Sequence, residues 1–208
     1  KKLDSPKKVQ DFLDNLKINF EEGGDTCLNP RAVLKYNKAH CIEGALLACL
    51  ALKLNGWQAW LVDLKASSKD YDHVIAVFKQ FEKYGAISKS NHSVLRYREP
   101  VYSSVKELVM SYFNEYCNKG RKTLRSFSVP VDVVKFDKLS LSSKDDNVWE
   151  VADYLDTVKH FSILDKKQIA NLRKQDLIEE RGQGIVEWTR GGKSLWVSEG
   201  IKKIKLKS

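Results

Sequence analysis

The sequence of 208 residues contains only four cysteines, and no two of them form a CxxC pair. This spacing argues against a structural zinc site, and so few cysteines do not make a disulfide scaffold. We therefore interpret all four as reduced thiols. Cys49 and Cys117 lie in apolar helical patterns typical of a core, and Cys27 lies in a loop-like stretch, GGDTCLNP. Cys41 is left without a structural explanation.

Long apolar runs are also absent. The longest, residues 45–52, is far shorter than the ~20 residues that span a bilayer. The first residues, KKLDSPKKVQDFL, lack the apolar segment of a signal peptide. With 42% hydrophobic and 30% charged residues, the composition is that of a globular protein. We expect no membrane association and a cytoplasmic location.

The net charge of +9 is concentrated at the two ends of the sequence. Residues 1–8 carry +3 and residues 200–208 carry +4, which leaves +2 for the middle. Basic ends contact phosphates without specificity, and they are more often simply solvated. We therefore expect no specific nucleic-acid partner. An accessory protein that uses its basic ends on nucleic acid is a weaker hypothesis.

Hydrophobic patterns place the first elements. Residues 6–19 are predicted to form an amphipathic helix after Ser5-Pro6. Residues 41–54 are apolar on nearly all sides, which predicts a buried helix that stops at Gly56. Three strands are then predicted, over residues 57–64, HVIAVFKQ and YGAISKSN. An extended loop is predicted over HSVLRYREPVYSS.

The remainder is predicted to contain a helix over 105–118, an extended segment, and helices over 145–161 and 165–181, the last capped by Asp165. Two strand-like runs around Gly191-Gly192 suggest a hairpin. We predict an α+β fold with a core over residues 1–120 and an α/β extension over residues 121–208 that packs on it.

The start of the buried helix contains a candidate nucleophile. It reads HCIEG, with Cys41 at the helix N-terminus. Backbone N–H groups there favour negative charge and lower a cysteine pKa, and a nearby imidazole completes the activation of a thiolate. His73, at the start of the second strand, is the predicted imidazole. His40 is expected to face elsewhere, as a capping or surface residue, and Glu43 to cap the helix.

The hairpin that follows His73 supplies a third group. A turn centred between Phe81 and Glu82 places His73 opposite Ser90. Asn91 or Ser88 would then accept a hydrogen bond from the His73 ring, and the register decides which. Asn91 has the better chemistry, because an amide oxygen is the stronger acceptor.

The sequence resembles the transglutaminase-like superfamily, which has the papain-like thiol fold. Three stretches carry the resemblance: HCIEGALLACLALKLNGWQAWLVDL, DHVIAVF and YGAISKSN. KSNHSVLRYREPVY looks like a poorly characterised bacterial branch of it. The resemblance implies a nucleophile helix packed on an antiparallel sheet. In this family a tryptophan is usually followed four residues later by an aspartate. Here Tyr84 and Ser88 take those places, so the aspartate is missing, and Asn91 would substitute as asparagine does in papain-like enzymes.

The resemblance implies acyl chemistry on an amide, namely peptide or isopeptide hydrolysis or acyl transfer, on a protein or peptide substrate without a cofactor. The papain-like oxyanion glutamine is missing, and Tyr36 is a candidate donor. His92 is a candidate at the rim of the site, and Arg96 a candidate clamp for a substrate carboxylate. A metal site that uses Cys41, His73 and either His40 or His92 lacks paired-ligand spacing, so we expect none.

The alternative is an inactive domain that keeps this fold to bind a protein or peptide. The missing aspartate and glutamine favour it, and the presence of both Cys41 and His73 disfavours it. The oligomeric state stays open.

Overall fold

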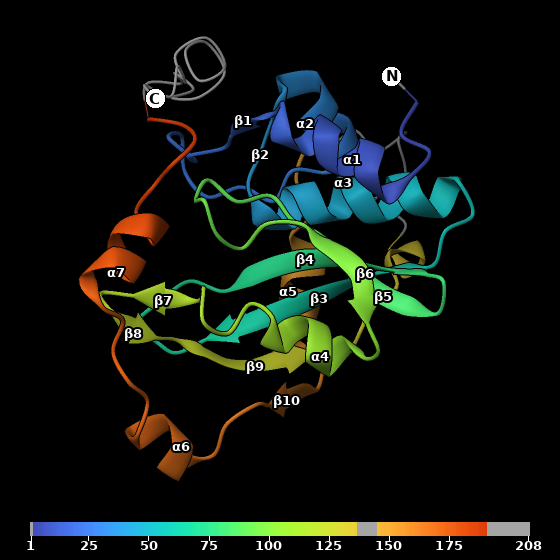
Figure 1. Ribbon diagram of the computed structural model, residues 1–208. Helices are drawn as coiled ribbons and strands as arrows, with labels where there is room; N and C mark the ends of the chain where they lie inside the picture. Colours follow the sequence, from blue (N-terminus) through green and yellow to red (C-terminus); the bar gives the residue numbers. More distant parts are fainter. Residues whose placement is uncertain (1, 137–144, 191–208) are drawn as a thin grey trace, which may run out of the picture.

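The computed structural model describes residues 2–136 and 145–190 and shows a mixed α+β fold (Figure 1). Six strands form one antiparallel sheet in the order β10-β9-β3-β4-β5-β6. The elements are α1 (Pro6–Asp14), β1 (Lys17–Ile18), α2 (Pro30–Tyr36), β2 (Lys38–Ala39), α3 (Cys41–Leu54), β3 (Ala59–Ala66), β4 (His73–Gln80), β5 (Lys83–Ile87), β6 (Arg98–Tyr102), α4 (Val105–Met110), β7 (Cys117–Asn118), β8 (Arg121–Lys122), β9 (Leu124–Ser128), a 3-10 turn (Val133–Lys135), α5 (Trp149–Thr157), β10 (His160–Ser162), α6 (Lys166–Ala170) and α7 (Leu177–Gln183).

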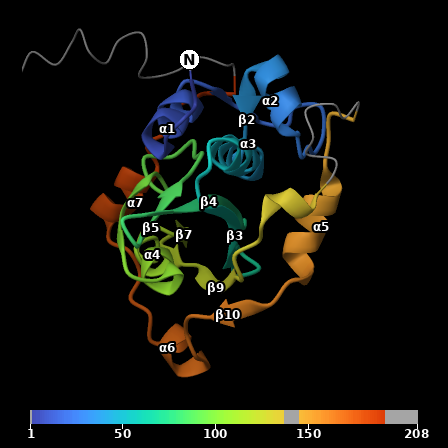
Figure 2. The ribbon, with the colours of Figure 1, turned by 90° about the vertical axis from the view of Figure 1, so that its right-hand side faces the viewer.

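Two hydrophobic layers sandwich the sheet. Figure 2 looks down α3, which lies between the sheet and the pair α1 and α2, with α5 to one side. The larger core cluster joins these helices to alternate residues of β4, namely Val74, Ala76 and Phe78. The other cluster joins Ile75 and Val77 to α4 and the residues after it. This alternation along β4 is the pattern of a strand buried on both faces.

The buried helix α3 is confirmed, because ten of its fourteen residues are buried. Cys49 lies in its interior and is fully buried, as expected. Gly56, with a φ of +79°, ends the helix in the left-handed region that glycine adopts without strain. None of the helices in the described ranges combines the length and the apolar character needed to cross a membrane.

The predicted register of the β4–β5 hairpin is also confirmed. Gln80 pairs with Lys83 and Ala76 with Ile87. Phe81 and Glu82 between them have φ angles of 50° and 59°, as a two-residue turn that matches the strand twist requires. Because β5 ends at Ile87, the ladder stops before His73 and the following segment is free to turn towards it.

Several predicted elements are shorter than expected. The helix predicted over 105–118 stops at Met110, where the amides of Tyr112 and Phe113 bond carbonyls three residues back, and the chain then enters the small β7–β8 hairpin. Cys117 is therefore half-buried in a strand, not in a helical core. The predicted loop after Asn91 contains β6, whose backbone pairs with β5 at the sheet edge.

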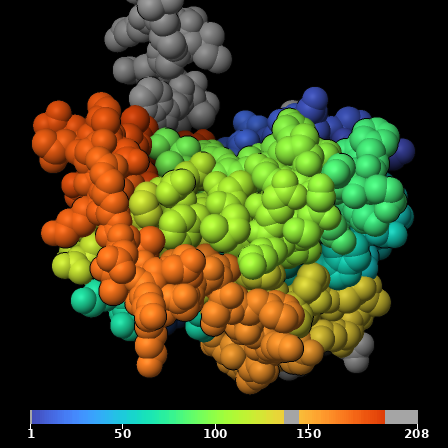
Figure 3. Space-filling model, turned by 60° about the horizontal axis from the view of Figure 1, so that its bottom comes forward, coloured from blue at the N-terminus to red at the C-terminus, as the bar shows by residue number. Residues whose placement is uncertain are grey.

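The C-terminal part shares its sheet with the rest of the chain, because β9 lies beside β3 and carries β10 at the edge. The sheet therefore continues across the predicted boundary at residue 120. Helix α5 begins at Trp149, and the helix predicted over 165–181 is two helices, of which the first is capped by Asp165 as expected. In Figure 3 this part forms a band along one side of the molecule. The hairpin predicted around Gly191-Gly192 lies outside the described residues.

Candidate active site

Cys41 is the first residue of α3 and is half-buried. His40 before it is the N-cap residue and has an extended backbone. Its N–H donates to the Glu43 carboxylate at 2.9 Å, so Glu43 caps the helix as predicted. The thiol therefore stands where the unpaired N–H groups and the dipole of a fourteen-residue helix favour an anion.

His40 does not face away from the thiol. Its Nδ1 atom lies 3.9 Å from the Cys41 sulfur, and its Nε2 atom lies 3.0 Å from the Thr26 carbonyl oxygen. The predicted capping position of His40 is confirmed, but the predicted direction of its ring was wrong, because it placed both residues on a regular helix, where neighbours diverge. His40 precedes the helix, and its extended backbone turns the ring back towards Cys41.

His73 is 7% exposed, and its Nε2 atom lies 2.8 Å from the Ser88 hydroxyl oxygen. Ser88 donates its own proton to the Leu95 carbonyl, so it accepts the bond from His73. Of the two predicted partners, Ser88 is the one that contacts the ring. The Asn91 side chain instead bonds the backbone N–H and carbonyl of Trp188, at 2.8 and 3.1 Å.

The surroundings of Cys41 lower the pKa of its thiol. Burial acts to raise the pKa of Cys41, but hydrogen bonds and charge from His40 and His73 outweigh it and hold the pKa well below its ordinary value. The other three thiols behave in the opposite way. Burial raises the pKa of Cys27 to about 12 and also raises the pKa values of Cys49 and Cys117.

Glu43 connects this site to the fold. It is fully buried, and it accepts hydrogen bonds from the Asn19 amide, the Thr26 hydroxyl and the Leu28 backbone N–H, besides that of His40. Its Oε1 atom also lies 3.3 Å from Nε2 of His40. This supported carboxylate orients the His40 ring, which the sequence reasoning missed. The spacing of His40 and Glu43 across the helix start was the available signal.

A cleft of about 480 Å³ opens beside Cys41 and His73. Asn91 and His92, both predicted for the site, line it as well, and His92 bonds the Gln183 carbonyl through Nδ1 at 3.0 Å. Residues from far along the chain complete the lining, including Tyr116, Cys117, Gln175, Glu180 and Gln183. The cleft wall therefore comes partly from the C-terminal part of the chain.

Two other predicted site residues lie away from this cleft. The Tyr36 hydroxyl donates to Asp146 on the surface, so it is not in place to hold an oxyanion at Cys41. Arg96 pairs with Glu187 at 2.9 Å and with Asp14 at 3.5 Å. These two carboxylates already neutralise the guanidinium, which removes the reason to expect a substrate clamp there.

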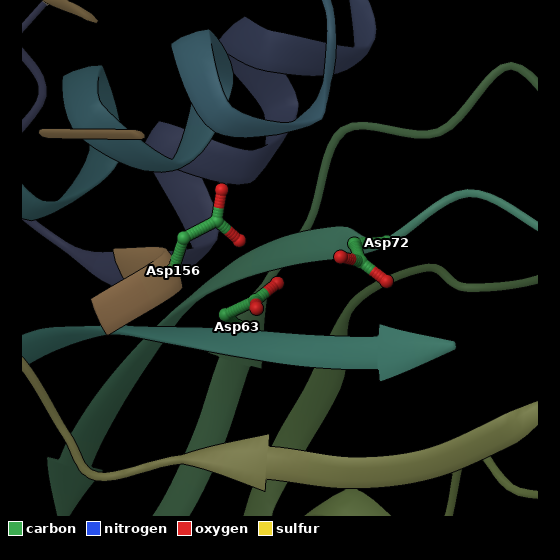
Figure 4. Close-up of side chains that lie close together, drawn as sticks. All are labelled: Asp63, Asp72 and Asp156. Carbon is green, nitrogen blue, oxygen red and sulfur yellow. The ribbon is translucent and has the colours of Figure 1, made fainter. Parts of the chain in front are cut away.

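A second, smaller pocket of about 200 Å³ is also lined by Cys41 and contains Asp63, Asp72 and Asp156. Figure 4 shows the three carboxylates facing one another, and one oxygen of each lies within 4.8 Å of the others. Lys65 bonds two of them, Asp72 at 2.9 Å and Asp156 at 2.6 Å. The lysine supplies the positive charge that a metal ion would bring, so we propose no metal here.

Asp63 makes a testable contribution to stability. Burial raises its pKa to about 6, against the hydrogen bond from His160. Because the pKa of Asp63 is higher in the folded than in the unfolded state, the contribution of its carboxyl to the free energy of unfolding is fully present below about pH 4. It is lost as the pH rises through about 6. Asp63→Asn should therefore raise the free energy of unfolding by about 1–2 kcal/mol at about pH 8 and leave it unchanged at about pH 4.

Urea denaturation at both pH values measures this difference. Asp156→Asn is the matched control, because Asp156 belongs to the same cluster and its side chain is 68% exposed. It should change stability by no more than about 0.5 kcal/mol at either pH. Equal effects of the two variants would contradict the assignment of the cost to burial.

Comparison with known proteins does not assign a family. The scan against family models found no match, and the search of curated proteins found none either.

Proposed function

We propose that this protein performs cysteine-dependent acyl chemistry on an amide, either hydrolysis of a peptide or isopeptide bond or transfer of the acyl group. Cys41 is the nucleophile, His73 moves the proton and Ser88 orients His73. The observation that carries the proposal is a thiol at a helix N-terminus, with its pKa held well below the ordinary value, on the wall of an open cleft.

The chain order supports a fold of the transglutaminase-like, papain-like type. Helix α3 carries the thiol at its start and packs on the antiparallel sheet. The next two strands, β3 and β4, follow directly, and β4 begins with the histidine. In this arrangement one helix end and one strand end meet, which brings two residues 32 positions apart to a single cleft.

The proposed reaction has two steps. The Cys41 thiolate attacks the amide carbonyl, a C–S bond forms, the C–N bond breaks, and His73 gives its proton to the leaving nitrogen. Water or an acceptor amine then attacks the thioester, gives a proton to His73 and releases the thiolate. The backbone N–H groups at the start of α3 are positioned to favour the negative charge on the carbonyl oxygen.

The alternative is a catalytically inactive domain that binds a protein or peptide. One observation favours it, because the partner of the His73 ring is a hydroxyl that is itself committed to the Leu95 carbonyl. A hydroxyl orients an imidazolium but adds no negative charge to stabilise it. The lowered pKa of Cys41 favours the enzyme, since a binding surface has no need of a thiolate.

Alkylation by iodoacetamide tests the proposal. The rate at Cys41 should stay high well below the ordinary thiol pKa of ~8.5, since the thiolate is the reactive form. The other three thiols, whose pKa values are raised, should react slowly at about pH 6, so the total rate reports on Cys41. Cys41→Ala supplies the background rate. A rate that follows an ordinary thiol titration would leave the binding domain as the better description.

A further inference from the structure

A second imidazole, that of His40, lies beside Cys41, and the proposed reaction does not use it. The Nδ1 atom of His40 lies 3.9 Å from the Cys41 sulfur, a distance within reach of a hydrogen bond to sulfur. The ring itself is mostly covered, with 20% of the side chain exposed. Because a single histidine suffices to move the proton in a thiol acyl transfer, the second one needs an explanation.

The far side of the His40 ring is held by three oxygens. Nε2 lies 3.0 Å from the Thr26 carbonyl, 3.3 Å from the Glu43 carboxylate and 3.4 Å from the Glu21 carboxylate. A carbonyl oxygen accepts only, so Nε2 carries a proton. Two carboxylates beside a largely covered ring then favour its charged form, in which Nδ1–H points at the sulfur.

The electrostatics of the ring agree with this geometry. Burial alone would lower the pKa of His40, but the hydrogen bond to Cys41, the charges of Cys41 and Glu43, and the bond to Thr26 raise it to about 9. Four neighbouring donors bond the carboxylate oxygens of Glu43 and hold it in place beside the ring.

His73 has different surroundings. Its Nε2 atom bonds the neutral Ser88 hydroxyl, and no carboxylate hydrogen bond or ion pair to its ring occurs in the described part of the chain. The His73 ring therefore faces the Ser88 hydroxyl and Cys41, whereas the His40 ring faces Cys41 and two carboxylates. The two histidines therefore suit two different tasks.

Building on the proposed function, we propose that His40 is a permanent imidazolium, anchored by Glu43 and Glu21, that holds Cys41 as a thiolate, and that this leaves His73 to carry the proton. The thiol proton resides on His40 throughout the cycle. His73 enters the cycle already protonated from solvent, gives that proton to the leaving nitrogen and takes one from the incoming water or amine, so the thiolate is regenerated with the charge on His40 unchanged.

The same substitution at the two histidines tests this division. His40→Gln keeps an N–H that can reach the Thr26 carbonyl but has no charge. The thiolate fraction, followed by its ultraviolet absorbance with Cys41→Ser as the blank, should fall by about tenfold at about pH 6 in His40→Gln and by no more than about threefold in His73→Gln. The reverse order would overturn the assignment.

A milder pair of variants guards against a folding defect. Glu21→Gln keeps the oxygen that accepts from the Thr26 backbone N–H and removes one charge beside His40, so the thiolate fraction should fall by about threefold. Glu22→Gln, the exposed neighbour, should leave it unchanged. No difference between these two would contradict the anchoring role of the carboxylate.

Acylation by an activated ester separates this inference from the proposed function. If the thiolate depends on His40 but no acyl-enzyme forms with p-nitrophenyl acetate, the His40 assignment stands and the acyl chemistry fails. If acyl-enzyme forms but the thiolate fraction does not depend on His40, the acyl chemistry stands and the His40 assignment fails.

Discussion

Glu43→Leu is expected to lower the free energy of unfolding by about 3–5 kcal/mol. The carboxylate is fully buried and receives bonds from side chains or backbone of four residues: Asn19, Thr26, Leu28 and His40. Leucine has a similar volume but accepts none of them, so the donors and the His40 charge stay buried without their partner. Urea denaturation monitored by far-ultraviolet circular dichroism measures the loss.

Glu107 provides a matched control for this variant. It occupies the same third position of helix α4 and accepts a backbone N–H, from Ser103 at 2.7 Å, but it is exposed. Glu107→Leu therefore removes a capping carboxylate without stranding buried donors and should cost about 1 kcal/mol or less. A similar cost for both glutamates would show that the buried network adds nothing beyond the cap.

Gly44→Ala should destabilise the protein by about 2–3 kcal/mol, although alanine is the better helix former by about 1 kcal/mol. A Cβ atom on Gly44 would lie 2.7 Å from Cβ of Lys89, which no rotation of the lysine side chain relieves. Lys89 is also fixed at its other end, where Nζ donates to the carbonyls of Leu13 and Leu16. The backbone around Lys89 has to move away from α3.

Chemical denaturation compares this variant with Gly182→Ala. Gly182 is also helical, and among the described residues no atom outside its own helix and chain neighbours lies within 4 Å of the position of its added Cβ. That substitution should be neutral or stabilise the protein by up to about 1 kcal/mol. A gain of stability in Gly44→Ala would mean that α3 and the segment of Lys89 are not in tight contact. Because Ser88 precedes Lys89, the same shift should also weaken the Ser88 bond to His73.

The parts of the fold that the sequence predicted are those fixed by local patterns. The apolar surface of residues 41–54 indicates burial wherever the helix packs, and the two-residue turn at Phe81 and Glu82 sets the hairpin register by itself. The placement of Cys41 and His73 on one cleft follows from these two elements. The helix predicted after Ser104 is shorter because the chain after Met110 turns towards the β7–β8 hairpin, where Thr123 donates to Tyr116, a pairing that propensity does not encode.

The arrangement within the site depends on distant contacts and could not be predicted in the same way. The choice between Ser88 and Asn91 is settled by Trp188, whose backbone occupies the Asn91 amide from nearly a hundred residues along the chain. The rotation of His40 towards Cys41 depends on the Thr26 carbonyl, which a separate loop delivers. In both cases a partner remote in sequence fixes a side chain whose own neighbours leave it free.

Cys41 lines both the wide cleft and the narrow acidic pocket, which under the proposed acyl chemistry would bear on the order in which reactants bind and leave. With a single binding cleft, the leaving amine has to dissociate before the second reactant binds, and the kinetics are those of double displacement. If the second reactant bound in the other pocket, it could bind before the amine leaves, and double displacement would no longer be required. An acceptor bound in the acidic pocket would then compete with neither the acyl donor nor the leaving amine, and the kinetics would include a ternary complex.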